Sequence, residues 1–320
     1  MQLDVLIPTY NRQEMLKLTL ASLLAAEVPQ GLSVRVTVVD NNSKDETRQV
    51  VEERREAFGG RLDYVFEGQQ GKSAALNAGI AATSGDLVGI IDDDEEVDAR
   101  WYVRVHEAFS RGDVDFIGGP YVPRWGAERP LWFPMSYTGV IGWVDGGDQV
   151  VAYDKDFPGI LMGGNCVITR ETLRKVGAFA TRYGRTDKHL LACEDEDMYR
   201  RLLSSGARGL YLPDLIIYHY VPPERLTRRY FRRWCFWRGV SLGMIDREHR
   251  AEQVAYLAGV PRWLYGAAAR GLLRKAAGAL GRGKDPAQSF AGELAAWDLA
   301  GFFYGKHFYR DGRSAGTGRD

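Results

Sequence analysis

Short apolar runs alternate with amphipathic segments over residues 3–220. Apolar runs of strand length occupy residues 3–7, 34–40, 62–66 and 87–91. Each is preceded or followed by a segment with helical spacing; the first such segment, residues 14–26, carries leucines at helical intervals. Continuous apolar runs are typical of parallel strands that are buried on both faces. Their alternation with helices predicts an α/β fold with a doubly wound, mostly parallel sheet and right-handed crossovers.

The rest of the pattern up to residue 219 adds further helices and strands, with a less regular stretch at 121–157. Further helices are expected at about 45–57, from 71, at 99–109, from 171 and at 193–205, and further strands at 116–120, 163–168, 210–213 and 215–219. Residues 121–157 are rich in Gly, Pro and Trp. Long loops in a compact domain are usually functional, so this segment is expected to form loops over a cleft.

A Pro-Pro pair at 222–223 predicts a domain boundary. Beyond it lie two basic amphipathic segments, 226–238 and 263–281, and a helical segment, 289–308. The chain is therefore divided into an α/β domain over 1–222, a helical C-terminal extension over 223–309 and a Gly-rich, disordered tail over 310–320. No internal repeat is apparent.

Charge is distributed unevenly although the formal net charge is zero. Residues 1–222 hold 24 Lys+Arg and 33 Asp+Glu, giving −9, whereas residues 223–320 hold 18 and 9, giving +9. This asymmetry predicts an N-terminal domain that binds cations and a C-terminal region that faces an anionic partner. A nucleic-acid partner is not favoured, because it leaves the acidic half unexplained.

Three cysteines, Cys166, Cys193 and Cys235, form neither a CxxC motif nor a paired framework. This usage is typical of a reducing compartment. The start of the chain has no basic region of a signal peptide, and no run reaches about 18 apolar residues. We therefore expect a cytoplasmic protein, with peripheral attachment to the cytoplasmic membrane face as the alternative to a purely soluble one.

An acidic cluster, Asp92-Asp93-Asp94-Glu95-Glu96, follows the apolar run at 87–91 directly. Adjacent carboxylates repel one another unless a cation lies among them, and ligands of open α/β sheets bind at the carboxyl ends of the strands. Oxygen donors suit Mg²⁺ or Mn²⁺, which commonly bind substrate phosphates as well. An EF-hand is excluded, because Val97 and Val103 stand where that loop needs Gly and Glu. A solvated acidic turn is the alternative.

Seven motifs, in order, resemble those of the family 2 glycosyltransferases, nucleotide-sugar enzymes of GT-A fold. They are VLIPTYNR at 5–12, VVDNNSKDET at 38–47, GKSAALNAGI at 71–80, GDLVGIIDDDE at 85–95, GGNCVITRETLRKVGAF at 163–179, CEDEDMYRRLLSSG at 193–206 and LPDLIIYH at 212–219. The resemblance spans residues 3–220 and implies a GT-A domain with a helical C-terminal extension.

The resemblance also implies roles for individual residues. The nucleotide-sugar contacts that it implies are Thr9, Tyr10 and Arg12 in the first loop, Asp40 at the base, Lys72 and Asn77 beside the ribose and phosphate, and Asp92 and Asp93. The metal ligands that it implies for Mn²⁺ or Mg²⁺ are Asp94, Asp92 and His219. The sugar and acceptor pocket is expected to be lined by Gly163, Gly164, Asn165 and Glu194, with Asp195 as the general base. Because the acidic runs at 92–96 and 194–197 are dense, other acids within them are alternatives for the metal ligands and for the base.

The function expected from this resemblance is metal-dependent, inverting transfer of a sugar from a nucleotide diphosphate donor, by default UDP-linked. The expected acceptor is a glycan or lipid-linked glycan of surface polysaccharide. A sugar-phosphate nucleotidylyltransferase is one alternative, although residues 8–12 lack its Gly-rich phosphate loop. A catalytically silent scaffold that binds metal and nucleotide is the other.

The basic segment 225–238 allows three interpretations. It packs on the sheet domain with solvated arginines, it closes over the donor diphosphate, or it lies on an anionic membrane leaflet through Tyr230, Trp234 and Trp237. The second basic segment, 263–281, favours the membrane interpretation.

Overall fold

The structure is a computed structural model of the chain and describes residues 1–181, 194–248, 250, 254–279 and 285–310. The described residues form two compact units. The first comprises residues 1–124, 143–181 and 194–220, and the second comprises residues 125–142 and the described part of 221–310. The predicted boundary at 222 does not anticipate that residues 125–142 join the C-terminal helices. Cys193 and the tail residues 311–320 lie outside the described residues.

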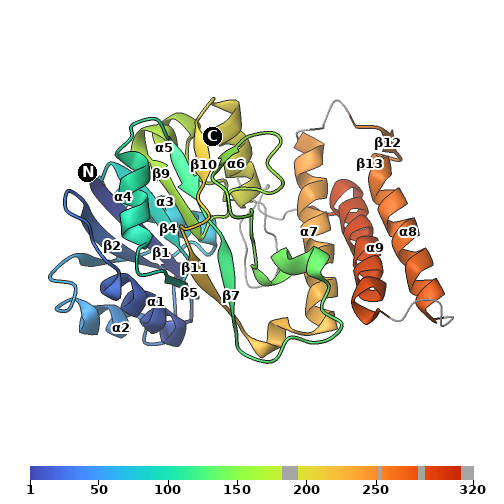
Figure 1. Cartoon of the computed structure of the whole chain (residues 1–320), viewed down its shortest axis with the longest axis horizontal. Helices are drawn as coiled ribbons and strands as arrows, with labels where there is room; N and C mark the ends of the chain where they lie inside the picture. Colours follow the sequence, from blue (N-terminus) through green and yellow to red (C-terminus); the bar gives the residue numbers. More distant parts are fainter. Residues whose placement is uncertain (182–193, 249, 251–253, 280–284, 311–320) are drawn as a thin grey trace, which may run out of the picture. The chain divides into compact units, whose positions relative to one another are not determined.

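An eight-stranded sheet organises the first unit (Figure 1). Its strand order is β3 (Leu62–Phe66), β2 (Ser33–Asp40), β1 (Gln2–Thr9), β4 (Leu87–Ile91), β9 (Asn165–Thr169), β6 (Phe116–Gly118), β10 (Gly209–Tyr211) and β8 (Val151–Tyr153). The first four strands are mutually parallel, β9 runs antiparallel to β4 and β6, and β8 runs antiparallel to β10. The predicted mostly parallel α/β sheet is confirmed.

Both faces of this sheet are buried, which explains the continuous apolar runs. Val5 and Ile7 of β1 belong to the same hydrophobic cluster as Leu16 and Leu20 of α1, whereas the intervening Leu6 belongs to a second cluster. Successive side chains of a strand point to opposite faces. The covering helices are α1 (Gln13–Ala25), α2 (Thr47–Arg54), α3 (Lys72–Ala82), α4 (Trp101–Phe109), α5 (Arg170–Val176) and α6 (Glu194–Ser204).

Residues 121–157, expected as loops, include three short strands or helices. β7 (Tyr121–Trp125) joins β11 (Ile217–Val221) and β5 (Glu95–Val97) in a three-stranded sheet, η1 (Met135–Ile141) is a 3₁₀ helix, and β8 pairs with β10. Residues 125–142 join the second unit through aromatic contacts. The ring centroid of Trp132 lies 5.5 Å from that of Phe231 and 5.1 Å from that of Phe290.

A buried ion pair connects β1 to the start of α5. Asp4 is fully buried, and its Oδ2 accepts hydrogen bonds from the Gly85 N–H at 2.6 Å and from Arg170 at 3.2 Å. The Arg170 guanidinium also donates to the backbone oxygens of Gly85 and Ile80, at 2.6 and 3.0 Å. One arginine therefore satisfies carbonyls from the end of α3 and the following turn while it neutralises a buried carboxylate.

The Arg170→Met variant is expected to lower the free energy of unfolding by about 3–5 kcal/mol, because it leaves a buried charge without its partner. Urea unfolding followed by circular dichroism measures the loss. Arg174→Met, at an exposed position of the same helix, is the matched control and should change stability by no more than about 0.5 kcal/mol. Equal stability of the two variants would contradict a stabilising role for the Asp4 pair.

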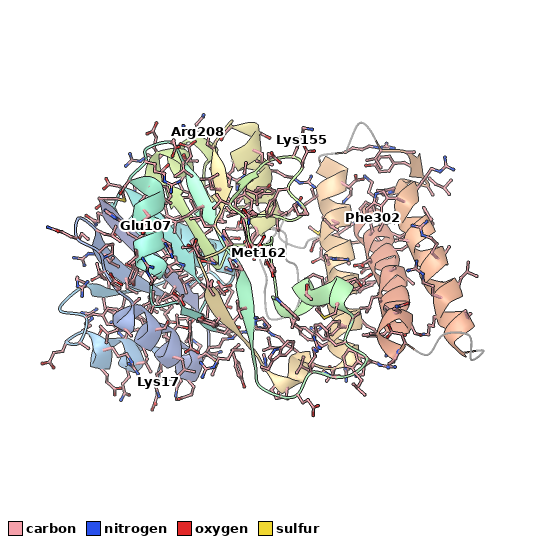
Figure 2. All side chains as sticks on the ribbon, in the orientation of Figure 1. Lys17, Glu107, Lys155, Met162, Arg208 and Phe302 are labelled. Atoms are coloured by element: carbon pink, nitrogen blue, oxygen red, sulfur yellow. The ribbon has the colours of Figure 1, made fainter. Side chains whose placement is uncertain are left out.

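Three helices form the core of the second unit, namely α7 (Arg228–Glu248), α8 (Arg262–Ala279) and α9 (Pro286–His307). Helix α9 packs against both α7 and α8 (Figure 1). Phe302 of α9, labelled in Figure 2, belongs to a buried cluster with Val260 and Leu264. The remaining short elements of this unit are η2 (Pro223–Arg225), β12 (Tyr256–Leu257) and β13 (Val260–Pro261). No helix among the described residues is long and apolar enough to cross a membrane.

Glycines bring the backbones of α7 and α9 into direct contact. A Cβ atom at Gly301 would overlap the carbonyl oxygen of Phe236, and one at Gly305 would overlap that of Val240. A Cβ atom at Gly239 of α7 would likewise overlap the carbonyl of Asp298. Small residues allow this close approach of helices. We call this contact the glycine seam; it explains why glycines that look like helix stops lie inside long helices.

Candidate active site

The loops that follow β1 and β2 are joined by hydrogen bonds. Asn11 has a φ of 52°, in the left-handed region that asparagine tolerates better than most residues. Its backbone N–H donates to Ser43 Oγ at 2.9 Å, and its side-chain oxygen accepts from the Lys44 N–H at 2.7 Å. The predicted nucleotide loop, residues 9–12, is therefore held to residues 41–44, which follow the predicted base contact Asp40.

A buried asparagine joins the third loop to the second. Asn41 Nδ2 donates to the carbonyl oxygens of Glu67 and Gln69 at 3.1 and 2.7 Å, and its Oδ1 accepts from the Gly71 N–H at 2.7 Å. Helix α3 begins at Lys72, one residue later. Asn41 thus determines where the lysine-bearing helix starts, a role that the sequence does not reveal.

Asp40, the predicted base contact, is buried at the end of β2. Its Oδ1 accepts from the Ser43 N–H at 2.8 Å and its Oδ2 from the Tyr64 hydroxyl at 2.7 Å. Burial and this hydrogen bond raise the pKa of Tyr64 to about 12. Both carboxylate oxygens are oriented by the protein. Tyr10, in the preceding loop, is half-buried.

The acids that follow β4 have distinct partners. Lys72 Nζ lies 2.6 Å from Asp92 Oδ1 and 2.8 Å from its Oδ2. The Arg12 guanidinium lies 3.0 Å from Asp93 Oδ1 and 2.8 Å from Asp94 Oδ2, and the Thr9 hydroxyl donates to Asp93 Oδ2 at 2.8 Å. The structure therefore brings together the predicted residues of the first loop, α3 and the acidic run.

Asp93 and Glu95 are the buried members of this run. Burial raises the pKa of Asp93 to about 6, although the Arg12 guanidinium opposes the shift. Burial, with the carboxylates of Asp92 and Asp94, raises the pKa of Glu95 well above its usual range. Glu95 Oε2 accepts the Asp92 N–H at 2.8 Å. Glu95 therefore holds the turn that presents Asp92, a role not assigned to it from the sequence.

The residues predicted to bind a metal are only partly assembled. His219 Nε2 lies 3.7 Å from Asp94 Oδ2. In the described part of the chain, no group of three or more His, Cys, Asp or Glu side chains has the geometry of a metal site, and Asp92 is paired with Lys72. A carboxylate beside an imidazole nitrogen nevertheless fits the preferences of Mn²⁺. Asp94 and His219 are thus the two predicted ligands that lie close together, and metal binding by them stays a prediction.

Two glycines allow the backbone to pass close to carboxylates from two segments, the acidic run and the first turn of α6. A Cβ atom at Gly163 would overlap the carboxylate of Asp195, in the first turn of α6. A Cβ atom at Gly164 would overlap Glu95 and lie 2.9 Å from Asp92 Oδ2. Met162, labelled in Figure 2, packs against the hydrophobic core just before this pair. The predicted base and the acidic run therefore meet at Gly163–Gly164.

The Tyr121 hydroxyl also lies at Gly163–Gly164. The Gly164 N–H donates to the hydroxyl oxygen of buried Tyr121 at 2.7 Å. Burial, followed by the carboxylates of Glu95, Asp92 and Asp195, raises the pKa of Tyr121 well above its usual value. Tyr121 was missed because its segment was expected to be a loop. The Gly118-Gly119-Pro120 turn directly before Tyr121 was the sequence feature that could have drawn attention to it.

Lys72 lies among acids from two segments. Burial lowers the pKa of its ammonium group, but the carboxylates of Asp92, Asp195 and Glu194 raise it more, so that the pKa lies above the usual value. Glu194, predicted in the acceptor pocket, is buried in the first turn of α6. Lys72 is therefore a fixed positive charge between the acidic run and the predicted base.

Two asparagines that are predicted to contact ligands also bond to distant parts of the protein. Asn77 donates to the carbonyl oxygen of Phe179 at 2.9 Å and accepts from its N–H at 2.8 Å. Asn165 is buried; it donates to Leu215 O at 2.7 Å and accepts from the Trp101 indole at 2.9 Å. These bonds give both residues structural roles, and ligand contact by either one stays a prediction.

Comparisons with known proteins agree with this geometry. A family model described as glycosyl transferase family 2 matches residues 4–177. The chain is 27% identical over 255 residues to a glucosyl-dolichyl phosphate glucuronosyltransferase of Haloferax volcanii, covering 77% of this chain and 78% of that protein. It is 24% identical over 251 residues to the succinoglycan biosynthesis protein ExoM of Rhizobium meliloti, covering 78% and 76%.

A solved structure supports the fold. The mannosyltransferase PcManGT of Pyrobaculum calidifontis, in complex with GDP-Man and Mn²⁺, superposes with a TM-score of 0.62 at 21% identity, covering 95% of this chain and 86% of that one. A mostly parallel sheet with C-terminal helices and a GT-A neighbour confirm the predicted GT-A fold. The family match covers more than half of the 320 residues. The chain is therefore a glycosyltransferase and belongs to glycosyltransferase family 2.

Proposed function

We propose that this glycosyltransferase transfers a sugar from a nucleoside diphosphate donor, UDP-linked by default, to a hydroxyl group of a glycan or lipid-linked glycan, with inversion of the anomeric centre. The observation that carries the proposal is the meeting of Asp195 with Asp92 and Glu95 at Gly163–Gly164. Related proteins support the acceptor class. The Haloferax relative is named for a dolichyl phosphate-linked sugar, and the Rhizobium relative for a polysaccharide. Surface polysaccharide assembly is therefore the proposed setting.

In the proposed reaction the bond between the anomeric carbon and the diphosphate oxygen breaks as the acceptor oxygen attacks. Asp195 accepts the proton of the acceptor hydroxyl, a contribution typically worth about 10²–10⁴-fold. Lys72 lies beside both Asp92 and Asp195, where its positive charge can stabilise the departing diphosphate. The Arg12 guanidinium, which is paired with Asp93 and Asp94, is the second positive charge that can stabilise the departing diphosphate.

Asp94 and His219 are proposed to hold Mn²⁺ or Mg²⁺, with Asp92 as a further oxygen donor. When bound, such a cation stabilises negative charge on the leaving diphosphate. In this structure Arg12 is paired with Asp94 and Lys72 with Asp92, so these cations occupy carboxylates that would bind the metal. Their guanidinium and ammonium groups would then turn toward the phosphates of the donor.

A panel of nucleotide sugars tests this function, with Mn²⁺, Mg²⁺ or EDTA and with release of nucleoside diphosphate as the readout. We expect release with one donor class, reduced at least tenfold by EDTA and restored by added cation. Calorimetric titration of UDP and GDP with and without cation measures binding separately, since release needs the true acceptor. Absence of cation-dependent nucleotide binding would refute the proposal. Binding without release across glycan and lipid-linked acceptors would favour the catalytically silent scaffold.

A further inference from the structure

Helix α8 buries only a narrow stripe of its surface. Among residues 262–277, whose burial is described, the buried positions are Leu264, Ala268 and Gly271, at the i, i+4 and i+7 spacing of one helical face. Gly271 lies against Gly292 of α9, where a Cβ atom on either residue would overlap the backbone of the other. Figure 1 shows α8 on the side of α9 that is remote from α7. Most of α8 is therefore outward-facing surface.

That outward surface carries large apolar side chains. Trp263 is 60% exposed and Leu273 is 71% exposed, whereas Leu272, which is 49% exposed, lies at the edge of the buried stripe, next to Gly271 and four residues after Ala268. Single exposed leucines are ordinary in soluble proteins. A tryptophan and a leucine on the outer face of the same helix are different, because neither side chain is buried against the rest of the protein. The side chains are suited to burial against something outside the chain.

The same helix is basic throughout. Residues 262–279 contain Arg262, Arg270, Arg274 and Lys275 and no Asp or Glu. The three arginines and Lys275 are exposed, and Lys275 forms an ion pair of 2.8 Å with Glu293 of α9. Cations that flank apolar side chains on a surface helix are characteristic of helices that lie in the interface of an anionic bilayer.

We propose that the outer face of α8 binds an anionic lipid bilayer, with Trp263 and Leu273 in the interface and Arg270 and Arg274 on lipid phosphates. A second copy of the chain is a poorer occupant. A two-fold interface would place the arginines of one α8 against those of its partner. An anionic surface instead neutralises them while it covers the apolar side chains. The inference concerns binding and does not depend on the proposed function.

Segment 225–238, the other candidate for membrane contact, is packed within the helical unit. Trp234 is half-buried, and the Arg238 guanidinium lies 5.2 Å from its ring centroid. Arg232 is bound to Glu293 at 2.5 Å. These residues are engaged within the helical unit. Some arginines of 225–238 are exposed, but its large apolar side chains are buried or half-buried, whereas Trp263 and Leu273 of the second segment are exposed.

Sedimentation of the full-length protein with vesicles tests the inference. Vesicles of phosphatidylcholine alone and of phosphatidylcholine mixed with phosphatidylglycerol are compared at low and high salt. Wild-type protein is expected to bind the anionic vesicles with salt-sensitive affinity, and the neutral ones weakly. Arg270→Gln/Arg274→Gln should weaken anionic binding roughly 25-fold, at about fivefold for each arginine near the surface. The matched control, Arg55→Gln/Arg111→Gln, removes two exposed arginines of the first unit and should bind like wild type.

A second variant, Trp263→Ser/Leu273→Ser, tests the apolar contribution and should abolish the binding that survives high salt. All substituted side chains are exposed, and unchanged circular dichroism spectra would verify folding. Failure of wild-type protein to bind anionic vesicles would overturn the proposal, as would equal binding by the Arg270→Gln/Arg274→Gln variant and its control. Light scattering provides a separate check. A dimer that is lost in Trp263→Ser/Leu273→Ser would assign the face to a second copy and refute the lipid interaction.

Discussion

The Asp195→Asn variant is expected to bind donor like wild type and to lose about 10²–10⁴-fold in turnover. The amide has nearly the shape of the carboxylate, so it fits beside Gly163 where the carboxylate now lies. It cannot accept the proton of an acceptor hydroxyl. Steady-state kinetics with the identified donor and acceptor measure turnover, and calorimetric titration measures donor binding.

Asp197→Asn is the matched control, because it makes the same substitution one half-turn along α6. Asp197 accepts two hydrogen bonds from Arg201, at 2.9 and 2.7 Å. This i,i+4 pair is half-buried, and the asparagine oxygen can still accept a hydrogen bond from Arg201. Turnover should therefore stay within a few-fold of wild type. If Asp197→Asn lost turnover and Asp195→Asn kept it, the base would have to be assigned to another acid of this run.

The Gly301→Val variant is expected to destabilise the helical unit by about 3 kcal/mol or more. Overpacking of a well-packed core typically costs about 1–3 kcal/mol, and here a side chain would meet backbone, which cannot change rotamer. The overlap is with the carbonyl of Phe236 on α7. Differential scanning calorimetry should show a lowered transition for the helical unit. Because the chain has two compact units, the scan is fitted with two transitions.

Ala300→Val controls for the helix propensity of valine. Ala300 is the adjacent residue of α9 and is exposed, so the same side chain at this position meets solvent. Its expected cost is the propensity difference alone, below about 1 kcal/mol. Equal destabilisation by the two variants would show that the glycine seam is not a close backbone contact.

The parts of the fold that were predicted correctly share a local cause. β4 is buried at every position and β1 at all but its first, so their sequences are nearly continuous apolar runs that can be recognised without knowledge of the partner strand. The short strands β5 and β8 were missed for the opposite reason. β5 reads Glu95-Glu96-Val97 and β8 is largely exposed, so neither has a strand pattern of its own. Their pairing depends on strands far away in the sequence.

The helical unit also depends on long-range contacts. The amphipathic segment recognised in the sequence ends at 238, yet α7 continues through Gly239 and Gly243 to Glu248, and both glycines lie against the backbone of α9. Residues 125–142 gave no sign of joining this unit, since the partners of Trp132 are Phe231 and Phe290. Such pairings have no signature in a single sequence.

The candidate site was predictable where a motif carries the chemistry. The acidic run, Lys72, the two glycines and Asp195 converge as the family resemblance implies. Structural roles were harder to predict than motif positions. Asn77 bonds to the backbone of Phe179, and Asn165 bonds to the backbone of Leu215 and to the Trp101 indole, whereas their predicted ligand contacts stay predictions. Glu95 and Tyr121 look incidental, although both are buried among the acids.

The hydrogen bonds of Asn41 have a consequence for how donor preference evolves. Through Asn11, Ser43 and Asn41, the three nucleotide loops form one connected structure. A substitution that reshapes one loop to accept a different base therefore also moves the loop that carries Lys72. A change of donor should require compensating substitutions in more than one loop. Single-site libraries at Asp40 or Tyr10 are then expected to yield weakened enzymes, and switched ones should come from libraries that vary the loops together.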